Sequence, residues 1–290
     1  MSQLQAYIED LEELWRCYDT VWSSFSAQDW SRKFGKDWTF ADQPYHLAYF
    51  DRVILADALE AGGDLPQSAR WAPRTMRELD AWNEREFARR PAGQTPQRSL
   101  EELREVRDRL RVVLSKFTDG DLDTYRAWNH LIGEWTTLRV FLEMAFTHNW
   151  SEYSELLLRS GRTEPAPPPA TARTAIKFYL LFMASLGKPE RVKESFTVGW
   201  DFVGPASAQW TLRVAGGSSS VTPGLPADAD VSLRLTPDTF NTVMLRRARN
   251  PMLAMLRGDL KVKGFTKMGA MMKIFPEPGP DDVLDMPLPS

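Results

Sequence analysis

The first half of the chain places apolar residues at helical spacing. Near the N-terminus an amphipathic face recurs every three or four residues: Leu4, Ile8, Leu11, Trp15, Tyr18, Trp22 and Phe25. Three more helices are predicted: one from near Asp42, with Pro44 in its first turn, to Gly62 and Gly63; one behind a capping-box pattern of Ser99 and Glu102; and one over 135–160, ended by Gly161. Four helices with long connections predict a bundle, whose core can hold a site between facing side chains.

The second half changes to an alternating pattern, which predicts strands over 196–202, 210–214, 231–235 and 260–262. Gly216-Gly217 and Pro223-Gly224 mark turns. Helices are predicted over 172–187, behind Thr236-Pro237, behind Asn250-Pro251 as far as Gly258, and over 265–275. This mixture predicts an α+β domain in which helices pack against a sheet.

A proline-rich segment separates the two patterns. Four of the five residues 165–169 are proline, which cannot continue a helix and favours an extended spacer. Nine of eleven tryptophans and all three histidines precede this segment, whereas eight of eleven methionines and every predicted strand follow it. We therefore expect a helical domain over 1–162, a linker over 163–171, an α+β domain over 172–280 and a tail over 281–290.

Composition narrows the functional classes. The 290 residues carry 36 basic and 39 acidic side chains, a net charge of −3, so the chain lacks the positive field of a nucleic-acid binder. A single cysteine, Cys17, excludes a disulfide framework and a cysteine-rich zinc module, and no base is predicted beside it to make it a nucleophile. The N-terminus lacks a signal-peptide pattern and no run of ~18 apolar residues occurs, so we expect a cytoplasmic protein.

Candidate chemistry in the first half centres on His46, His148 and Glu152. His148 and Glu152 are four residues apart on one predicted helix, so their side chains point the same way. If His46 faces them across the bundle, two imidazoles and a carboxylate converge, a set that suits a divalent metal with an open position. Packed, hydrogen-bonded histidines are the alternative, and His130 is expected to be structural. The charged residues around 101–111 are expected to form a solvated helix face.

Residues 166–290 contain no histidine, no cysteine, no phosphate loop and no nucleophile elbow, so we predict no catalytic residue there. They are instead rich in soft apolar side chains, which fit an irregular cavity or, alternatively, fill a solid core: Phe240, Met244, Met252, Met255, Phe265, Met268, Met271, Met272 and Phe275. Between residues 244 and 275 eight basic side chains accompany one acid, Asp259. Such a patch suits transient contact with an anionic membrane surface, with a solvated rim as the alternative.

Two short motifs in the first half resemble the DinB/YfiT-like four-helix-bundle family. They are the stretch 38–51, which contains His46, and the stretch 147–156, which contains His148 and Glu152; the similarity covers roughly 5–162. The resemblance implies a divalent metal, such as zinc or nickel, held by one histidine on the second helix and an H-x₃-H pair on the fourth. Glu152 stands where the second histidine of that pair is expected, and a carboxylate can still ligate zinc.

The second half resembles a sterol carrier protein 2 (SCP2) domain over roughly 174–276. The resemblance rests on 229–240, on 250–264 with its Gly258-x-Leu-x-Val-x-Gly264 element, and on 268–275. It implies a mixed five-stranded sheet covered by helices, with a hydrophobic tunnel for lipids between the sheet face and the C-terminal helices. The predicted lipid-binding set is therefore Trp200, Trp210, Phe240, Met244, Met252, Met255, Met268, Met271, Met272 and Phe275.

Three functional hypotheses follow for this multidomain chain. The first is binding or carriage of a lipid or other apolar small molecule in the second domain, with the bundle as a partner domain. The second is a thiol-dependent metalloenzyme, because the same domain arrangement occurs in mycothiol-dependent maleylpyruvate isomerases, whose bundle metal activates a small thiol. The third is an assembly surface without chemistry. Bundles of this kind often pair, so a homodimer is also expected.

Overall fold

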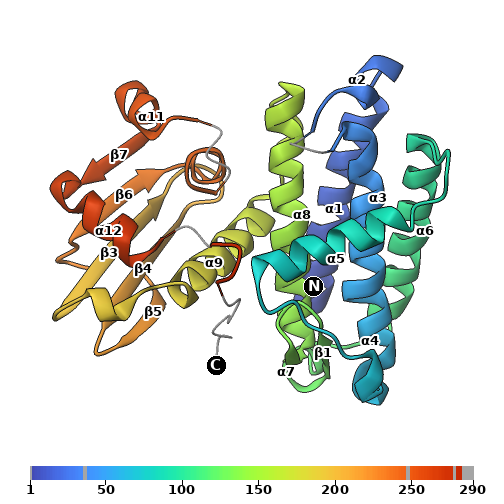
Figure 1. Ribbon diagram of the computed structural model, residues 1–290, viewed down its shortest axis with the longest axis horizontal. Coiled ribbons are helices and arrows are strands. Elements are labelled where there is room, and N and C mark those ends of the chain that lie inside the picture. Colours follow the sequence, from blue (N-terminus) through green and yellow to red (C-terminus); the bar gives the residue numbers. More distant parts are fainter. Residues whose placement is uncertain (1, 35–37, 246–248, 277–278, 283–290) are drawn as a thin grey trace. The chain divides into compact units, whose positions relative to one another are not determined.

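The computed structural model describes residues 2–34, 38–245, 249–276 and 279–282 (Figure 1). The chain divides into two compact units, Met1–Pro167 and Pro168–Ser290. Most of the expected C-terminal tail, from residue 283 on, lies outside the described residues, as do Arg246 and Arg247 of the basic stretch. Every helix in the described part of the chain is too short or too polar to cross a lipid bilayer.

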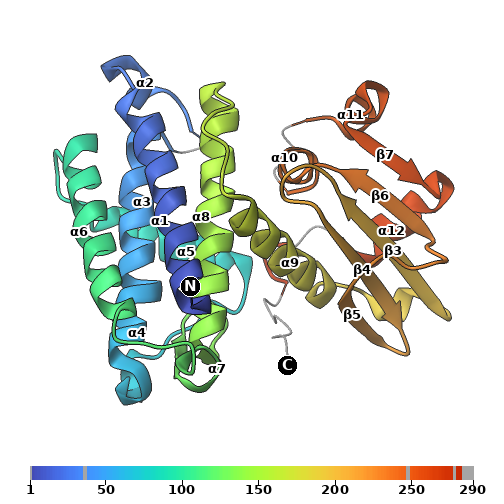
Figure 2. The same ribbon diagram turned by 180° about the vertical axis from the view of Figure 1, so that it is seen from behind.

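The first unit is built around four long helical segments that stand side by side in both ribbon views (Figures 1 and 2). They are α1 (Gln3–Ser23); α3 (Gln43–Phe50), continued by η2 (Asp51–Ala56) and α4 (Asp57–Ala61); α6 (Pro96–Leu114); and α8 (Leu138–Ser160). The segment η2 is a π-helical stretch within the second helix. Helix α8 is enclosed on all sides, since 17 of its 23 residues are buried.

Local capping explains where two of these helices begin. Thr95 caps α6, its hydroxyl accepting the Arg98 N–H at 3.2 Å, and Pro96 occupies the first helical turn. The capping box predicted at Ser99 and Glu102 is therefore wrong, because Ser99 is a buried residue inside the helix. Helix α8 begins at Leu138, capped by Thr137, three residues later than predicted.

Several elements of the first unit were not predicted. Helix α5 (Met76–Ala88) runs across the bundle in Figure 1, and only Trp82 and Glu86 of its residues are buried, which leaves its apolar pattern weak. Strands β1 (Arg126–Asn129) and β2 (Glu134–Thr137) form an antiparallel ribbon, so the expectation of no strand before the linker was wrong. The shorter helical elements are α2 (Ala27–Ser31), η1 (Phe40–Asp42), η3 (Gly62–Asp64), η4 (Gln67–Ala69) and α7 (Asp121–Thr124).

The second unit is a mixed five-stranded sheet with helices, which confirms the predicted fold class. The strand order is β5-β4-β3-β6-β7; β3 and β6 are parallel and the other pairs antiparallel. The strands are β3 (Ser195–Phe202), β4 (Ala208–Ala215), β5 (Ser218–Pro223), β6 (Val231–Leu235) and β7 (Leu260–Lys263). The alternating pattern missed β5 because this edge strand begins with three serines and is mostly exposed.

The helical elements of the second unit are α9 (Pro169–Ser185), η5 (Pro189–Arg191), α10 (Pro237–Thr239), η6 (Phe240–Leu245), α11 (Pro251–Arg257), η7 (Phe265–Lys267) and α12 (Met268–Ile274). Helix α9 starts at Pro169, within the segment predicted as linker, because proline suits the first turn of a helix. Thr236 and Asn250, which precede two of the predicted helices, cap them by accepting hydrogen bonds from Thr239 N and Met252 N. The helix predicted over 265–275 is split into η7 and α12.

Candidate metal centre

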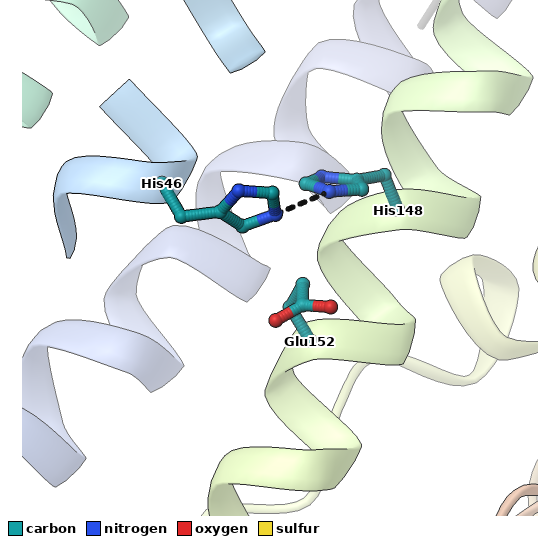
Figure 3. A group of neighbouring side chains, drawn as sticks. All are labelled: His46, His148 and Glu152. Atoms are coloured by element: carbon teal, nitrogen blue, oxygen red, sulfur yellow. Dashed lines mark hydrogen bonds between the residues drawn. The ribbon is translucent and has the colours of Figure 1, made fainter. Parts of the chain in front are cut away.

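His46, His148 and Glu152 converge in the core of the bundle (Figure 3). His46 comes from α3, and His148 and Glu152 lie one turn apart on α8. One ligand atom from each residue lies within 4.8 Å of the others, and the two Nε2 atoms are 3.0 Å apart. His46 is 5% exposed, Glu152 is 9% exposed and His148 is half-buried, so the structure brings the three predicted ligands together.

A hydrogen-bond chain orients the His46 ring. The Tyr49 hydroxyl donates to Asn83 Oδ1 at 2.8 Å and lies 2.5 Å from His46 Nδ1. Burial, and then the Glu152 carboxylate, raise the pKa of Tyr49 well above its ordinary value, so this hydroxyl keeps its proton. Because the hydroxyl proton is given to Asn83, the hydroxyl accepts from His46 Nδ1–H. This tautomer leaves the Nε2 lone pair of His46 for a ligand.

Aromatic rings enclose the two imidazoles. Phe50 stacks on His148 with ring centroids 3.5 Å apart and planes 7° apart. Trp38 lies 4.8 Å from the His46 ring, and Phe87 of α5 lies parallel to it at 6.4 Å. Apolar walls of this kind lower the local dielectric and strengthen every electrostatic interaction inside them.

Gln43 ties the two ligand-bearing helices together. Its side chain is fully buried, and its Nε2 donates to the backbone oxygen of Glu152 at 3.0 Å. Gln43 is one turn before His46 on α3, so this hydrogen bond fixes the position of His46, along the helix axis, relative to Glu152. Gln43 lies within the family-like stretch 38–51, but nothing in the sequence indicated its role, because its partner is a backbone atom more than a hundred residues away.

A buried ion pair braces a third helix against the same turns. Arg107 Nε of α6 lies 3.5 Å from Asp51 Oδ2, and its Nη2 lies 3.4 Å from Asn149 Oδ1. Asp51 follows Phe50 in the chain, and Asn149 follows the candidate ligand His148. The contacts of Arg107 therefore connect α6 to the two helical turns that carry the site. Burial raises the pKa of Asp51, an effect that Arg107 opposes, and burial also lowers the pKa of Arg107.

Arg107 corrects the interpretation of the charged stretch 101–111. That stretch was expected to be a solvated face, yet the Arg107 side chain is 3% exposed, whereas Arg109 and Arg111 in the same stretch form surface ion pairs. The guanidinium of Arg107 lies 5.0 Å from the Trp15 ring centroid and 5.5 Å from that of Tyr18. The guanidinium of Arg107 therefore packs on aromatic rings of α1 and is not exposed to solvent, as the charge pattern had predicted it would be.

The donor set fits a divalent metal ion. Two zinc–nitrogen bonds of ~2.0–2.1 Å at a tetrahedral angle place the nitrogens about 3.3 Å apart, close to the 3.0 Å between the two Nε2 atoms. A carboxylate one helical turn away completes three protein ligands, the number typical of a site that keeps a position for water or substrate. His46, His148 and Glu152 would hold the ion.

His130 and Cys17 lie apart from this group. The His130 ring stacks on Trp71 at 4.6 Å and its Nδ1 lies 3.1 Å from the Trp71 carbonyl oxygen, while burial lowers its pKa. Cys17 is buried, its Sγ lies 3.7 Å from the Ala166 carbonyl oxygen, and burial raises its pKa. Both environments suit a structural role.

In the second unit the predicted lipid-binding residues differ widely in exposure. Trp200, Phe240, Met271 and Phe275 are buried; Trp210, Met244, Met255 and Met268 are half-buried; Met252 and Met272 are exposed. Two hollows of about 400 Å³ are lined by other described residues. Their role in lipid binding stays a prediction.

Comparisons with known proteins cover both units. The DinB superfamily model matches residues 10–156, and the SCP-2 sterol transfer family model matches residues 192–275. No curated protein matches the sequence. Among solved structures, a histidine-to-alanine mutant of mycothiol-dependent maleylpyruvate isomerase has 10% identity and a TM-score of 0.50, with 82% of this chain and 87% of that chain covered. The unmutated isomerase gives the same identity and coverage and a TM-score of 0.49. At this identity the likeness shows a shared fold.

Proposed function

The chain belongs to the DinB superfamily and carries an SCP-2 sterol transfer domain, and from this we propose that its bundle binds a divalent metal ion and uses it in a thiol-dependent reaction. The observation that carries the proposal is the convergence of His46, His148 and Glu152 within 4.8 Å. The thiol is proposed because the isomerase that shares the fold over most of the chain is mycothiol-dependent.

The residues around the candidate metal site have separate roles in this proposal. A bound divalent ion supplies a Lewis acid that lowers the pKa of a thiol and makes a thiolate available at neutral pH. The Tyr49–Asn83 pair holds the His46 ring in the ligating tautomer, and Gln43 sets the spacing of α3 and α8. Trp38 covers one side of the His46 ring and Phe50 one side of the His148 ring, and these apolar faces lower the local dielectric at the candidate site.

Metal analysis of untagged protein tests the first half of this proposal. We expect stoichiometric zinc, nickel or manganese in the wild type, loss of that metal in His148→Ala and Glu152→Gln, and full metal content in the matched control His130→Ala. Metal-poor wild-type protein that cannot be reconstituted, or unchanged metal in His148→Ala, would contradict it. Turnover of maleylpyruvate in the presence of mycothiol, assayed in the same variants, tests the thiol-dependent step.

A second candidate function is the binding of an amphiphilic molecule by the second unit. It is favoured by buried polar atoms for which no hydrogen-bond partner exists in the described ranges: Nε1 of Trp200, Nε1 of Trp210 and both amide atoms of Asn241. Trp200 and Trp210 are cross-strand partners on β3 and β4, and Trp200 packs edge-on against Phe240 at 5.5 Å, next to Asn241 in the chain. Buried polar groups normally have partners, and the polar end of a bound lipid would supply them.

Titration with a fluorescent fatty acid, combined with native mass spectrometry, tests this second function. We expect binding by the wild type and weaker binding by Asn241→Leu, whose fold should be as stable as that of the wild type because the substitution removes polar atoms without bonds. A protein that ignores the probe refutes lipid binding. Unchanged affinity in Asn241→Leu would instead assign the amide to a buried water.

A further inference from the structure

Helix α11 exposes large apolar side chains to solvent. On this seven-residue helix Met252 is 51% exposed, Leu253 51% and Leu256 81%. They occupy positions i, i+1 and i+4, so they lie on one continuous side of the helix. Most large apolar side chains of the described residues are buried, and Leu256 is the most exposed of the exceptions.

Basic residues predominate in the chain on both sides of this helix. In the described stretch 249–275 the basic side chains are Arg249, Arg257, Lys261, Lys263, Lys267 and Lys273. The same stretch contains one acidic residue, Asp259. Lys267 is engaged with Asp230 at 2.6 Å, and Arg249 with Asp238 at 3.5 Å, both at the surface. An apolar helix side bordered by cations is the pattern of a segment that lies in a membrane interface.

A polar hollow of about 400 Å³ adjoins both ends of α11. Arg249, two residues before the first residue of the helix, and Gly258, its C-cap, both line the hollow. Arg234 and Lys261 add positive charge from β6 and β7, while Asp238 and Asp259 are its acidic residues. Two of these three cations are already in ion pairs, Arg249 with Asp238 and Arg234 with Asp201, so Lys261 is the cation that the hollow offers to an added phosphate group.

We propose that α11 docks the second unit on an anionic phospholipid surface. Met252, Leu253 and Leu256 enter the boundary between headgroups and acyl chains. Lys261 of the adjoining hollow contacts lipid phosphate. Charge complementarity selects this occupant, because an apolar patch flanked by basic segments and by a hollow that contains Lys261 matches a surface that is apolar beneath and negative above. The docking depends on neither the metal centre nor the interior site at Asn241.

Vesicle flotation of the full chain tests the proposal, with phosphatidylcholine vesicles compared with mixed phosphatidylcholine–phosphatidylglycerol vesicles. We expect binding to the mixed vesicles only, decreasing with added salt. Leu256→Ser should abolish most of it, whereas Val112→Ser, a matched change at a valine that is 60% exposed on α6, should leave it intact. Lys261→Gln should weaken binding about fivefold, and Lys116→Gln, in the turn after α6, should not.

Each other occupant of the patch gives a distinct result. Binding that Leu256→Ser leaves unchanged overturns the proposal. So does concentration-dependent dimerisation in analytical ultracentrifugation that Leu256→Ser removes, which would assign the patch to a second copy of the chain. Inorganic phosphate that displaces the protein from vesicles more strongly than chloride at equal ionic strength would assign the hollow to a free anion. All four variants change exposed side chains, so circular dichroism should match the wild type.

Discussion

Replacing Tyr49 with phenylalanine tests whether the His46–Tyr49–Asn83 chain prepares a metal ligand. The change removes only the hydroxyl that lies 2.5 Å from His46 Nδ1. A buried donor left without its acceptor costs about 1–3 kcal/mol of stability, whether or not metal is bound. Loss of the partner that orients a ligating histidine typically weakens metal binding by about 10–100-fold. We therefore expect Tyr49→Phe to lower the affinity for the metal about 10–100-fold.

Competition with a chromophoric chelator measures this loss, and cobalt spectra report whether the ligand geometry survives. Tyr45→Phe is the matched control, since Tyr45 lies one turn earlier on the same helix and its hydroxyl donates to the Glu86 carbonyl oxygen at 3.0 Å. That variant should lose stability but keep wild-type affinity for the metal. Equal affinities of Tyr49→Phe and Tyr45→Phe would refute the proposed orientation of His46.

Three further predictions concern the stability and reactivity of the chain. Arg107→Met should cost about 3–5 kcal/mol near neutral pH, because it leaves the Asp51 carboxylate buried without its counter-charge. Burial already raises the pKa of Asp51 in the folded state, and the substitution raises it further, so the folded state retains a proton that the unfolded state releases. The unfolding free energy of the variant should therefore fall as pH rises above the pKa of Asp51 in the unfolded state, which is about 4. The additional change Asp51→Asn should remove this pH dependence. Gly264→Ala should destabilise by more than about 1 kcal/mol in urea unfolding, because its φ is +74° and a Cβ would collide with a backbone carbonyl oxygen, whereas Gly269→Ala in α12 should be neutral or stabilising. The buried thiol of Cys17, whose pKa is raised, should react with iodoacetamide slowly in the native protein and rapidly in urea, and fast native labelling would contradict its burial.

Sequence pattern pointed to two of the three candidate metal ligands because their spacing is local. His148 and Glu152 are four residues apart on a long helix, and a helix of that length was evident from its apolar pattern and its terminal glycine. The convergence of His46 with them followed from the bundle topology and the family resemblance. The five-stranded sheet likewise followed from the resemblance, since alternation alone missed β5.

The residues that support the ligands could not be found in this way. Asn83 reaches Tyr49 from α5, a helix with a weak apolar stripe whose path across the bundle no local pattern specifies. Arg107 is one arginine among several on a charged helix, and only the packing of α1 and α8 determines that it is buried. Long-range partners of this kind depend on tertiary packing, to which hydrophobic periodicity is blind.

The enclosure of α8 links occupancy of its ligands to the folding of the whole bundle. Because a helix that is buried on all sides cannot retain its position when the bundle opens, the site exists only in the folded protein. An ion that binds the native state alone raises the unfolding free energy by about 2.7 kcal/mol at a free concentration one hundred times its dissociation constant. A shift in melting temperature can therefore rank candidate ions, and small thiols added on top of them, before any substrate has been identified.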